Sequence, residues 1–197
     1  MKQLLLTFFL SGLLLAATSS NFVLHNENVL LEKAAGKIEE MTGELHQKTG
    51  IGVYLSAIAK LPENESITRY QERVGADLKA PYVLISLSRL DRQIELSMSP
   101  DLSDRLDKEE VLDDYIIPIL VEMRKDIGPQ QQMSAALLNG IAFVTDTLAE
   151  QEGIVLASSI GNESKEFYDG LMWVIKIMIL LTAIGFFVAW RRNKQGA

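Results

Sequence analysis

The densest group of chemically active side chains in this sequence is acidic. The segment SPDLSDRLDKEE, residues 99–110, holds five carboxylates, among them Asp101, Asp104 and Asp107. A hard cation such as Ca²⁺ prefers oxygen ligands gathered on one loop, so these three residues are the candidate metal ligands. The central glycine and the terminal ligand pattern of an EF-hand are missing. The alternative is a helix start, where acidic side chains are favoured by the helix dipole.

Other catalytic templates are absent from the sequence. It contains no GxGxxG, Walker A, HExxH or GxSxG motif. It contains no cysteine, which excludes disulfides, thiolate metal sites and cysteine nucleophiles. The two histidines, His25 and His46, have no ligand-type partner close in sequence. His46 falls at a polar position of a predicted helix, which predicts a solvated imidazole.

The charge of the chain is unevenly spread. The segment 21–169 contains all 26 acidic residues but only 14 of the 19 basic residues, so its formal charge is −12. A surface this acidic repels phosphate backbones, which argues against nucleic acid as a partner. It suits a basic partner or cations better.

The first residues predict a signal peptide. In MKQLLLTFFLSGLLLAATSS one lysine precedes a short apolar run, and small residues follow. This is the order of regions in a secretory signal peptide, which we place at residues 1–19. The apolar run is short for a membrane-spanning helix. An uncleaved N-terminal anchor is the alternative.

A second apolar segment, residues 171–190, predicts one C-terminal transmembrane helix, because about 20 apolar residues cross a bilayer. Lys176 lies inside this segment, where its long side chain is expected to carry the ammonium back to the nearer interface. The alternative is an ion pair with an acid on a partner's membrane helix. Aromatic and basic residues mark the two interfaces: Tyr168, Trp173, Lys176, Trp190, Arg191 and Arg192.

The basic tail, residues 191–197, is expected in the cytoplasm by the positive-inside rule. A domain at residues 21–152 and a linker at 153–170 are then outside it. We therefore predict a single-pass protein of the bacterial cytoplasmic (inner) membrane, with its N-terminal domain in the periplasm. A eukaryotic secretory route is a further alternative.

Helical and strand periods alternate within the exported segment. The order of the predicted elements is α-β-α-β-β-α-α, which indicates a layered α/β domain with a small mixed sheet. Gly50 is expected to end the first helix, and Pro118 to kink or break the sixth element. The ranges are helix 28–49, strand 51–59, helix 66–78, strands 82–88 and 93–99, helix 107–127, a connector at 129–132 and helix 134–151.

Several segments carry a family resemblance. They are NFVLHNENVLLEKAAGKIEEMTGELHQKTGIGVYLSAIA (21–59), YVLISLSRLDRQIELSMSPDLSDRLD (82–107), IIPIL (116–120) and ALLNGIAFVTDTL (136–148). Together with a signal peptide, a C-terminal membrane helix and a basic tail, they resemble the membrane-tethered TPM-domain family. That family is named for a thylakoid lumen protein, a photosystem II repair protein and an acetylcholine-receptor modulator. The resemblance covers about residues 22–150.

The resemblance implies a Rossmann-like α/β/α sandwich that opens with a short strand. Some members of the family bind a divalent metal, a phosphatase activity has been claimed for a few, and others are accessory factors for membrane complexes. Asp91, Arg92 and Asp107 match the family pattern best. His25 stands where the family often has aspartate, and Ser99 and Asp101 stand where it usually has glycines. These departures weaken the transfer of any catalytic role.

Three functions follow as hypotheses. The first is a non-enzymatic, membrane-anchored extracytoplasmic domain that assists the assembly or turnover of a membrane complex, with a membrane or periplasmic protein as partner. The second is a metal-dependent phosphatase that uses acidic-loop carboxylates such as Asp101 and Asp107. The third is a sensor that binds a divalent cation such as Ca²⁺.

Overall fold

The structure, a computed structural model, describes residues 21–122 and 126–160. The predicted signal peptide, transmembrane helix, basic tail and interface residues Tyr168, Trp173, Lys176, Trp190, Arg191 and Arg192 lie outside the described residues. Within the part that is described, no helix combines the length and the apolar composition needed to cross a membrane.

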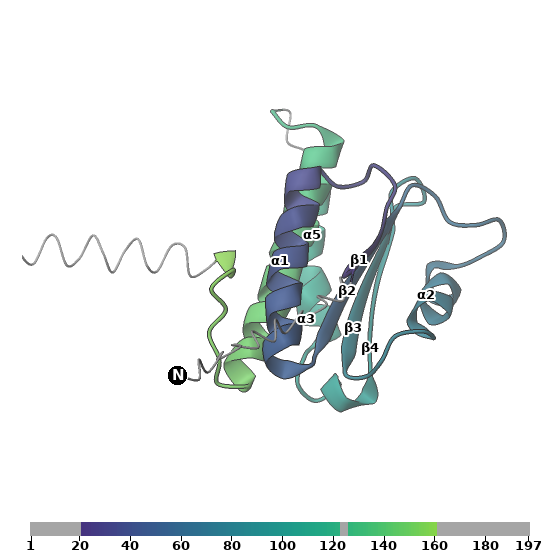
Figure 1. Cartoon of the computed structure of the whole chain (residues 1–197). Coiled ribbons are helices and arrows are strands. Elements are labelled where there is room, and N and C mark those ends of the chain that lie inside the picture. The colour runs from purple at the N-terminus through teal and green to yellow at the C-terminus, as the bar shows by residue number, and fades with distance from the viewer. Residues whose placement is uncertain (1–20, 123–125, 161–197) are drawn as a thin grey trace, which may run out of the picture.

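A four-stranded sheet forms the centre of the domain (Figure 1). The strands are β1 (Val23–Asn26), β2 (Gly52–Ile58), β3 (Tyr82–Ser88) and β4 (Gln93–Met98), which lie side by side in this order. β1, β2 and β3 are parallel, and β4 is antiparallel to β3. The predicted mixed sheet is therefore confirmed.

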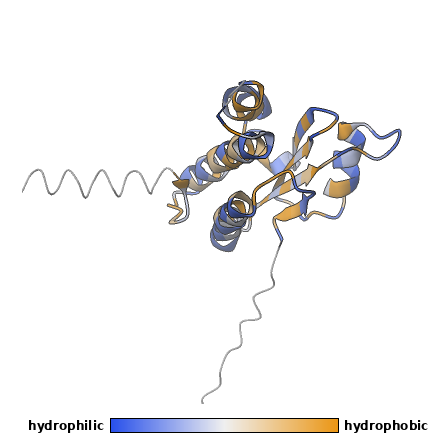
Figure 2. Cartoon of the chain, turned by 90° about the horizontal axis from the view of Figure 1, so that it is seen from above, coloured by the Kyte–Doolittle hydropathy of each residue, from blue (hydrophilic) through white to orange (hydrophobic). Residues whose placement is uncertain are grey.

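Helices lie on both faces of the sheet. The helices α1 (Glu32–Thr49) and α5 (Pro129–Gln151) cover one face, and α2 (Ile67–Gly75) lies on the other (Figure 1). Both apolar and polar residues recur along these helices, as is expected of helices with one buried face and one exposed face (Figure 2). The main core lies between the sheet and the α1–α5 pair. Its fully buried members include Ile38, Leu45, Val53, Leu55, Val83, Ile85, Leu137, Ile141 and Val144.

The end of α1 agrees with the prediction, and its start does not. Gly50 ends the helix with φ 79°, a left-handed conformation that glycine adopts without steric cost, and its N–H donates to the His46 carbonyl. The helix begins at Glu32 rather than at residue 28. The Asn26 side chain accepts hydrogen bonds from the N–H groups of Val29 and Leu30, and thereby holds this stretch in a turn.

The predicted connector at residues 129–132 is wrong, because these residues form the first turn of α5. Proline is favoured at this position, where its missing N–H leaves no helical hydrogen bond unmade. The Gln131 side chain also accepts from the N–H of Gly128, the residue before the helix. The glutamines are therefore helical despite their polar, linker-like composition.

The predicted helix 107–127 is shorter than expected and consists of three parts. They are α3 (Lys108–Glu110), the π-helical turn η2 (Val111–Ile116) and α4 (Ile117–Val121). Asp107 caps the start, since its Oδ1 accepts from the N–H groups of Glu109 and Glu110. Pro118 has no N–H to donate to the preceding turn, so the predicted break is confirmed as a change of helix type.

The chain after α5 folds back onto α1, and we call residues 153–160 the strap. The Glu44 carboxylate on α1 accepts from Ala157 N at 2.9 Å, Ser158 N at 2.8 Å and Ser158 Oγ at 2.5 Å. Lys48 Nζ contacts Glu44 at 2.6 Å and donates to the Val155 carbonyl at 2.9 Å. Leu156 is buried in the core. The first eight residues of the predicted linker are therefore packed against the domain.

The hydrogen bonds at Glu44 outweigh the cost of enclosing its charge. Burial alone would raise the pKa of this carboxyl group, but the bonds from Lys48, Ser158 and Ala157 lower the pKa from 4.5 to about 2. The side chain is 17% exposed. Glu44 thus stays ionised across the pH range in which the strap is held.

A glycine permits the close contact between η2 and α5. A Cβ atom at Gly140 would lie 2.3 Å from Cγ1 and 2.5 Å from Cδ1 of the buried Ile116. We expect Gly140→Ala to lower the free energy of unfolding by about 1–3 kcal/mol through overpacking. The matched control is Gly36→Ala in α1, where no atom lies within 4 Å. There, helix propensity should raise stability by about 0.5–1 kcal/mol. Urea unfolding of both variants measures the difference, and equal effects would contradict this packing.

The strap should depend on pH through Glu44. Its pKa is lower in the folded chain than in the unfolded chain, so its stabilisation is complete above about pH 4.5 and is lost as the pH falls toward about 2. We expect Glu44→Gln to cost about 1–2 kcal/mol at pH 7 and almost nothing near pH 2. Denaturant unfolding across this range measures the effect.

Glu40→Gln is the control for this substitution. Glu40 lies on the same helix and pairs with Lys37, but its side chain is largely exposed. It should change stability by less than about 0.5 kcal/mol at any pH. A Glu44→Gln effect that does not vary with pH would contradict the assignment.

Candidate functional site

The carboxyl ends of the parallel strands form the candidate site. In open α/β sheets, ligands bind in the crevice outside these ends. Three non-glycine residues with positive φ occur among the described residues, and one lies in each loop that follows a parallel strand. They are Asn28 (54°), Asn64 (62°) and Arg92 (54°). Sparsely populated backbone conformations tend to gather at functional sites, which supports this edge of the sheet as the candidate site.

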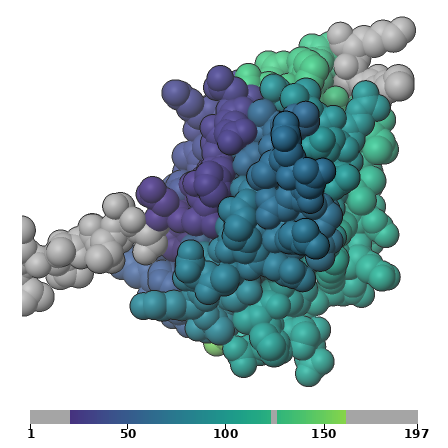
Figure 3. All heavy atoms as spheres, turned by 90° about the vertical axis from the view of Figure 1, so that its right-hand side faces the viewer, coloured from purple at the N-terminus to yellow at the C-terminus, as the bar shows by residue number. Residues whose placement is uncertain are grey.

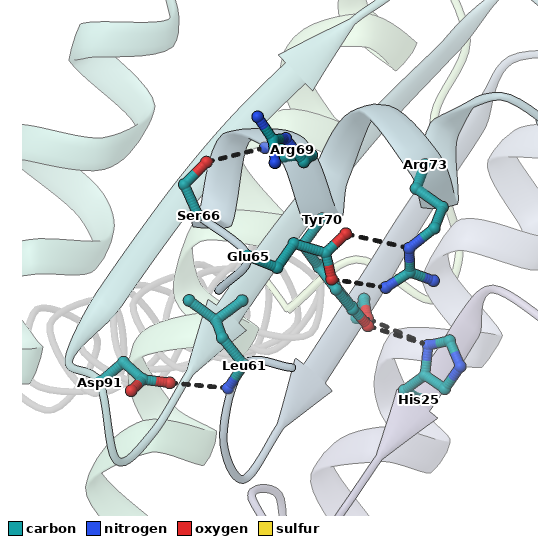
Figure 4. A network of polar contacts seen from close by, with 9 residues as sticks. His25, Leu61, Glu65, Ser66, Arg69, Tyr70, Arg73 and Asp91 are labelled. Carbon is teal, nitrogen blue, oxygen red and sulfur yellow. Dashed lines mark hydrogen bonds and ion pairs between the residues drawn. The ribbon is translucent and has the colours of Figure 1, made fainter. Parts of the chain in front are cut away.

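A register shift in β1 turns His25 toward the α2 side of the sheet. Val23 lies opposite Leu55 and His25 lies opposite Ser56, so two steps on β1 match one step on β2. A bulge of this kind changes the face on which a side chain lies. Nδ1 of His25 is 3.1 Å from Ser56 Oγ and 3.4 Å from Tyr70 Oη (Figure 4).

Ser56 and Tyr70 form the buried part of this cluster. Their hydroxyl oxygens are 2.6 Å apart, and the two residues are 0% and 4% exposed. Burial raises the pKa of Tyr70, while the Ser56 hydrogen bond and the charge of Arg73 oppose the shift. The α2 helix lies on this face of the molecule (Figure 3). The Ser56 hydroxyl is therefore a fixed structural partner with no exposed surface for a substrate.

An ion pair holds the loop before α2 against the helix. Arg73 donates from Nε to Glu65 Oε1 at 3.1 Å and from Nη2 to Oε2 at 2.9 Å. Its guanidinium also lies 5.0 Å from the centre of the Tyr70 ring. The hydrogen bond from Arg73 lowers the pKa of Glu65, and Glu65 raises the pKa of Arg73. Ser66 caps the same helix by accepting from Arg69 N at 3.3 Å.

Asp91 joins the loop after β2 to the turn after β3. Its Oδ2 accepts from Leu61 N at 2.7 Å (Figure 4). The same oxygen accepts from Ser88 Oγ at 2.6 Å. These two bonds lower the pKa of the Asp91 carboxyl group. The two segments border an open depression of about 340 Å³. We call it the edge depression. Its lining residues are Lys60, Leu61, Pro62, Glu63, Asn64, Glu65, Asp91 and Gln93.

The structure separates the sequence-predicted site residues into two groups. Asp91 and Arg92 lie at the carboxyl edge, in the turn between β3 and β4. β4 then runs back so that Met98 pairs with Val83 near the start of β3. Asp101, in the short 3₁₀ helix η1 (Pro100–Leu102), therefore follows at the opposite edge of the sheet. Asp104 and Asp107 border another open depression there, of about 500 Å³.

The candidate metal ligands do not form a coordination group. Within residues 21–122 and 126–160, no three His, Cys, Asp or Glu side chains are placed to hold a metal ion. Asp107 uses Oδ1 as a helix cap, which favours the helix-start alternative for this residue. Divalent cation binding through Asp101, Asp104 and Asp107 stays a prediction.

His46 differs from its prediction as a solvated residue. Its ring lies 5.5 Å from the Phe22 ring, and Nδ1 is buried without a hydrogen-bond partner among the described residues. The sequence also did not identify Ser56, Glu65, Tyr70 or Arg73. The available signal was the serines within otherwise apolar strands: Ser56 in β2, and Ser86 and Ser88 in β3.

Comparison with known proteins gives similarity at the level of fold. No family model matches the chain, and no curated protein matches it. The solution NMR structure of the N-terminal domain of a protein from P. gingivalis has a TM-score of 0.54 at 13% identity. It covers 68% of this chain and 86% of that one. The NMR structure of BA42 from the psychrophilic bacterium Bizionia argentinensis has a TM-score of 0.45 at 15% identity, covering 61% and 82%.

Two serines on neighbouring strands test the hydrogen-bonded cluster. Ser56 and Ser86 lie opposite each other and are both fully buried, but Ser86 Oγ has no hydrogen-bond partner among the described residues. We expect Ser56→Ala to lower the free energy of unfolding by about 1–2 kcal/mol. Ser86→Ala, the control, should change it by less than about 0.5 kcal/mol or stabilise the fold. Equal losses in chemical denaturation would show that an internal water serves Ser86.

Proposed function

We propose that this protein is a membrane-anchored extracytoplasmic accessory domain that assists the assembly or turnover of a membrane protein complex by binding another protein. The proposal rests on the polar groups at the carboxyl edge of the sheet, which hold the surrounding structure in place. Glu65, Asp91 and Ser56 hold loops and a helix in place, while the edge depression between the loops stays open. A rigid, charged rim around an open depression suits recognition of a partner.

The chemistry around His25 supports binding more than hydrolysis. A nucleophile must be reachable by the substrate and lie beside its base. Ser56 is the hydroxyl beside His25, but it is enclosed and already bonded to Tyr70. The phosphatase alternative calls on Asp101 and Asp107, which lie at the other edge of the sheet from Asp91. No contact within residues 21–122 and 126–160 favours that alternative.

The placement of the domain relative to the membrane rests on the predicted helix 171–190. The strap holds the chain to Glu44 on α1 through Ser158, and to Asp146 on α5 through Ser159. Ten residues then precede the predicted helix, and they span at most about 36 Å when fully extended. A domain held this close to a bilayer works on neighbours in or near it. The resemblance to TPM-domain proteins, which include accessory factors for membrane complexes, supports the same role.

The arrangement of the sheet and helices supports the finer architecture implied by that resemblance. Helices on both faces of a mainly parallel sheet are what a Rossmann-like α/β/α sandwich requires. We propose that architecture, with one transmembrane helix added at the C-terminal end. Membership of the TPM-domain family is proposed on the resemblance of the sequence segments in residues 22–150.

Cross-linking in intact cells tests the function. The tagged full-length chain, cross-linked and then purified in mild detergent, should recover a membrane or periplasmic protein in a fixed ratio. The control is a tagged chain that keeps residues 1–20 and 161–197 but lacks the described domain, and it should not recover that protein. A full-length chain that runs alone would contradict the proposal. Metal-dependent turnover of an aryl phosphate, lost in Asp101→Ala and Asp107→Ala, would favour the phosphatase instead.

A further inference from the structure

The geometry points to a specific kind of partner for the edge depression. We propose that it binds an arginine or lysine side chain of a partner protein, in an extended segment where the basic residue stands beside an apolar one. This inference rests on the proposed function and names the surface and the chemistry that it recognises.

The depression has two walls that are tied to each other. The loop 60–65 forms one wall, and Asp91 and Gln93 form the other. The hydrogen bond from Leu61 N to Asp91 Oδ2 joins the two walls. Ser88 Oγ donates a second hydrogen bond to the same oxygen. A volume of about 340 Å³ lies within the usual range of ligand sites, roughly 300–1,000 Å³. The depression is open, and the Leu61–Asp91 bond fixes its two walls relative to each other.

The charges of the lining favour a cation. The lining holds three acidic residues, Glu63, Glu65 and Asp91, and one basic residue, Lys60; Glu65 is paired with Arg73, so Glu63 and Asp91 are the acids left for a partner. The hydrogen bonds at Asp91 lower its pKa and use only Oδ2, so Oδ1 accepts no hydrogen bond from the described part of the chain. Its carboxylate is thus ionised, fixed in orientation and left with one acceptor. Charge-assisted bonds to a guanidinium or ammonium use acceptors of this kind.

The same rim already holds a guanidinium of this chain. Glu65 binds Arg73 through two parallel hydrogen bonds, and the Tyr70 ring lies beside it. This pairing occupies Glu65, which leaves Asp91 and Glu63 for a partner. An organic cation fits better than a metal ion, since no three ligand-type side chains converge anywhere in residues 21–122 and 126–160.

An exposed leucine is next to Asp91 in the chain, outside the lining of the depression. Leu90, next to Asp91 in the turn, is 63% exposed. It offers apolar contact to a residue adjacent to the basic side chain. The formal charge of −12 on segment 21–169 would also speed the approach of a basic partner.

Peptide titration tests the proposal on the full-length, ¹⁵N-labelled chain in detergent micelles. The probe is acetyl-Ala-Arg-Leu-Ala-amide, and its counterpart carries neutral citrulline in place of arginine. The side-chain amide signals of Asn64 and Gln93 should shift and saturate with the arginine peptide. Affinity should fall by roughly threefold or more with citrulline, because one screened charge pair is lost.

Two variants and one control locate the site. Asp91→Asn keeps an acceptor for Leu61 N, and Glu63→Gln changes an exposed side chain. Each should weaken the arginine peptide by roughly threefold, whereas Glu109→Gln on α3 should not. Equal binding of the two peptides, or equal binding by wild type and both variants, would overturn the proposal. So would Mn²⁺ that broadens the same amide signals and displaces the peptide.

The double variant Asp91→Asn/Glu63→Gln separates this inference from the function on which it rests. In the cross-linking experiment, loss of the partner supports the edge depression as the contact surface. Retention of the partner overturns the surface but leaves the accessory role intact. A wild-type chain without a partner overturns the accessory role itself.

Discussion

The unbroken parallel register between β2 and β3 is the constraint on which the rest of the domain depends. The pairing runs from Gly52 opposite Tyr82 to Ile58 opposite Ser88. It places the ends of both strands at one edge, so the loop 59–66 and the turn 89–92 become neighbours although about 25 residues separate them in sequence. The hydrogen bond between Asp91 and Leu61 is possible only because of this register.

The same register divides the two faces of the sheet by chemistry. Residues such as Val53, Leu55, Val83 and Ile85 lie in the core under α1 and α5. On the other face, His25, Ser56, Ser86 and Glu95 stand opposite one another in a row across all four strands. α2 lies on this more polar face, with a small apolar cluster formed by Ile58, Leu61, Ile67 and Tyr70. Polar contacts therefore contribute much of what positions α2, whereas α1 and α5 are held by burial.

Local sequence signals predicted the ends and breaks of helices well where a single residue type has a strong effect on the backbone. Gly50 ended α1 and Pro118 interrupted a helix, each as expected, and Asp107 caps a helix start, which was the alternative to a metal ligand. The errors came where distant contacts decided. The segment Pro129–Gln132 was predicted to be a connector because its composition is polar. β1 was not evident from periodicity, because it is short and contains a register shift. It was implied only by the family resemblance.

The site was predictable only in part for the same reason. Asp91 and Arg92 were identified through a short motif, but Ser56, Tyr70 and Arg73 carry no motif, and they meet His25 and Glu65 only when strands and helix assemble. Asp101, Asp104 and Asp107 looked like one group because they are close in sequence. They follow β4, which ends at the opposite edge of the sheet from Asp91. Closeness in sequence does not indicate this separation.

The strap determines how a pulling force on the chain beyond residue 160 would reach the domain. Several donors from residues 157 and 158 meet a single carboxylate on α1, and Lys48 holds the Val155 carbonyl beside them. Tension applied beyond residue 160 would load the bond from Ser159 to Asp146 on α5 and then these bonds, before it reached the end of α5. The force would enter the domain through the side of its central helix pair. If the predicted helix 171–190 anchors the chain, its movements would then tilt the domain as one body and leave the last turn of α5 wound.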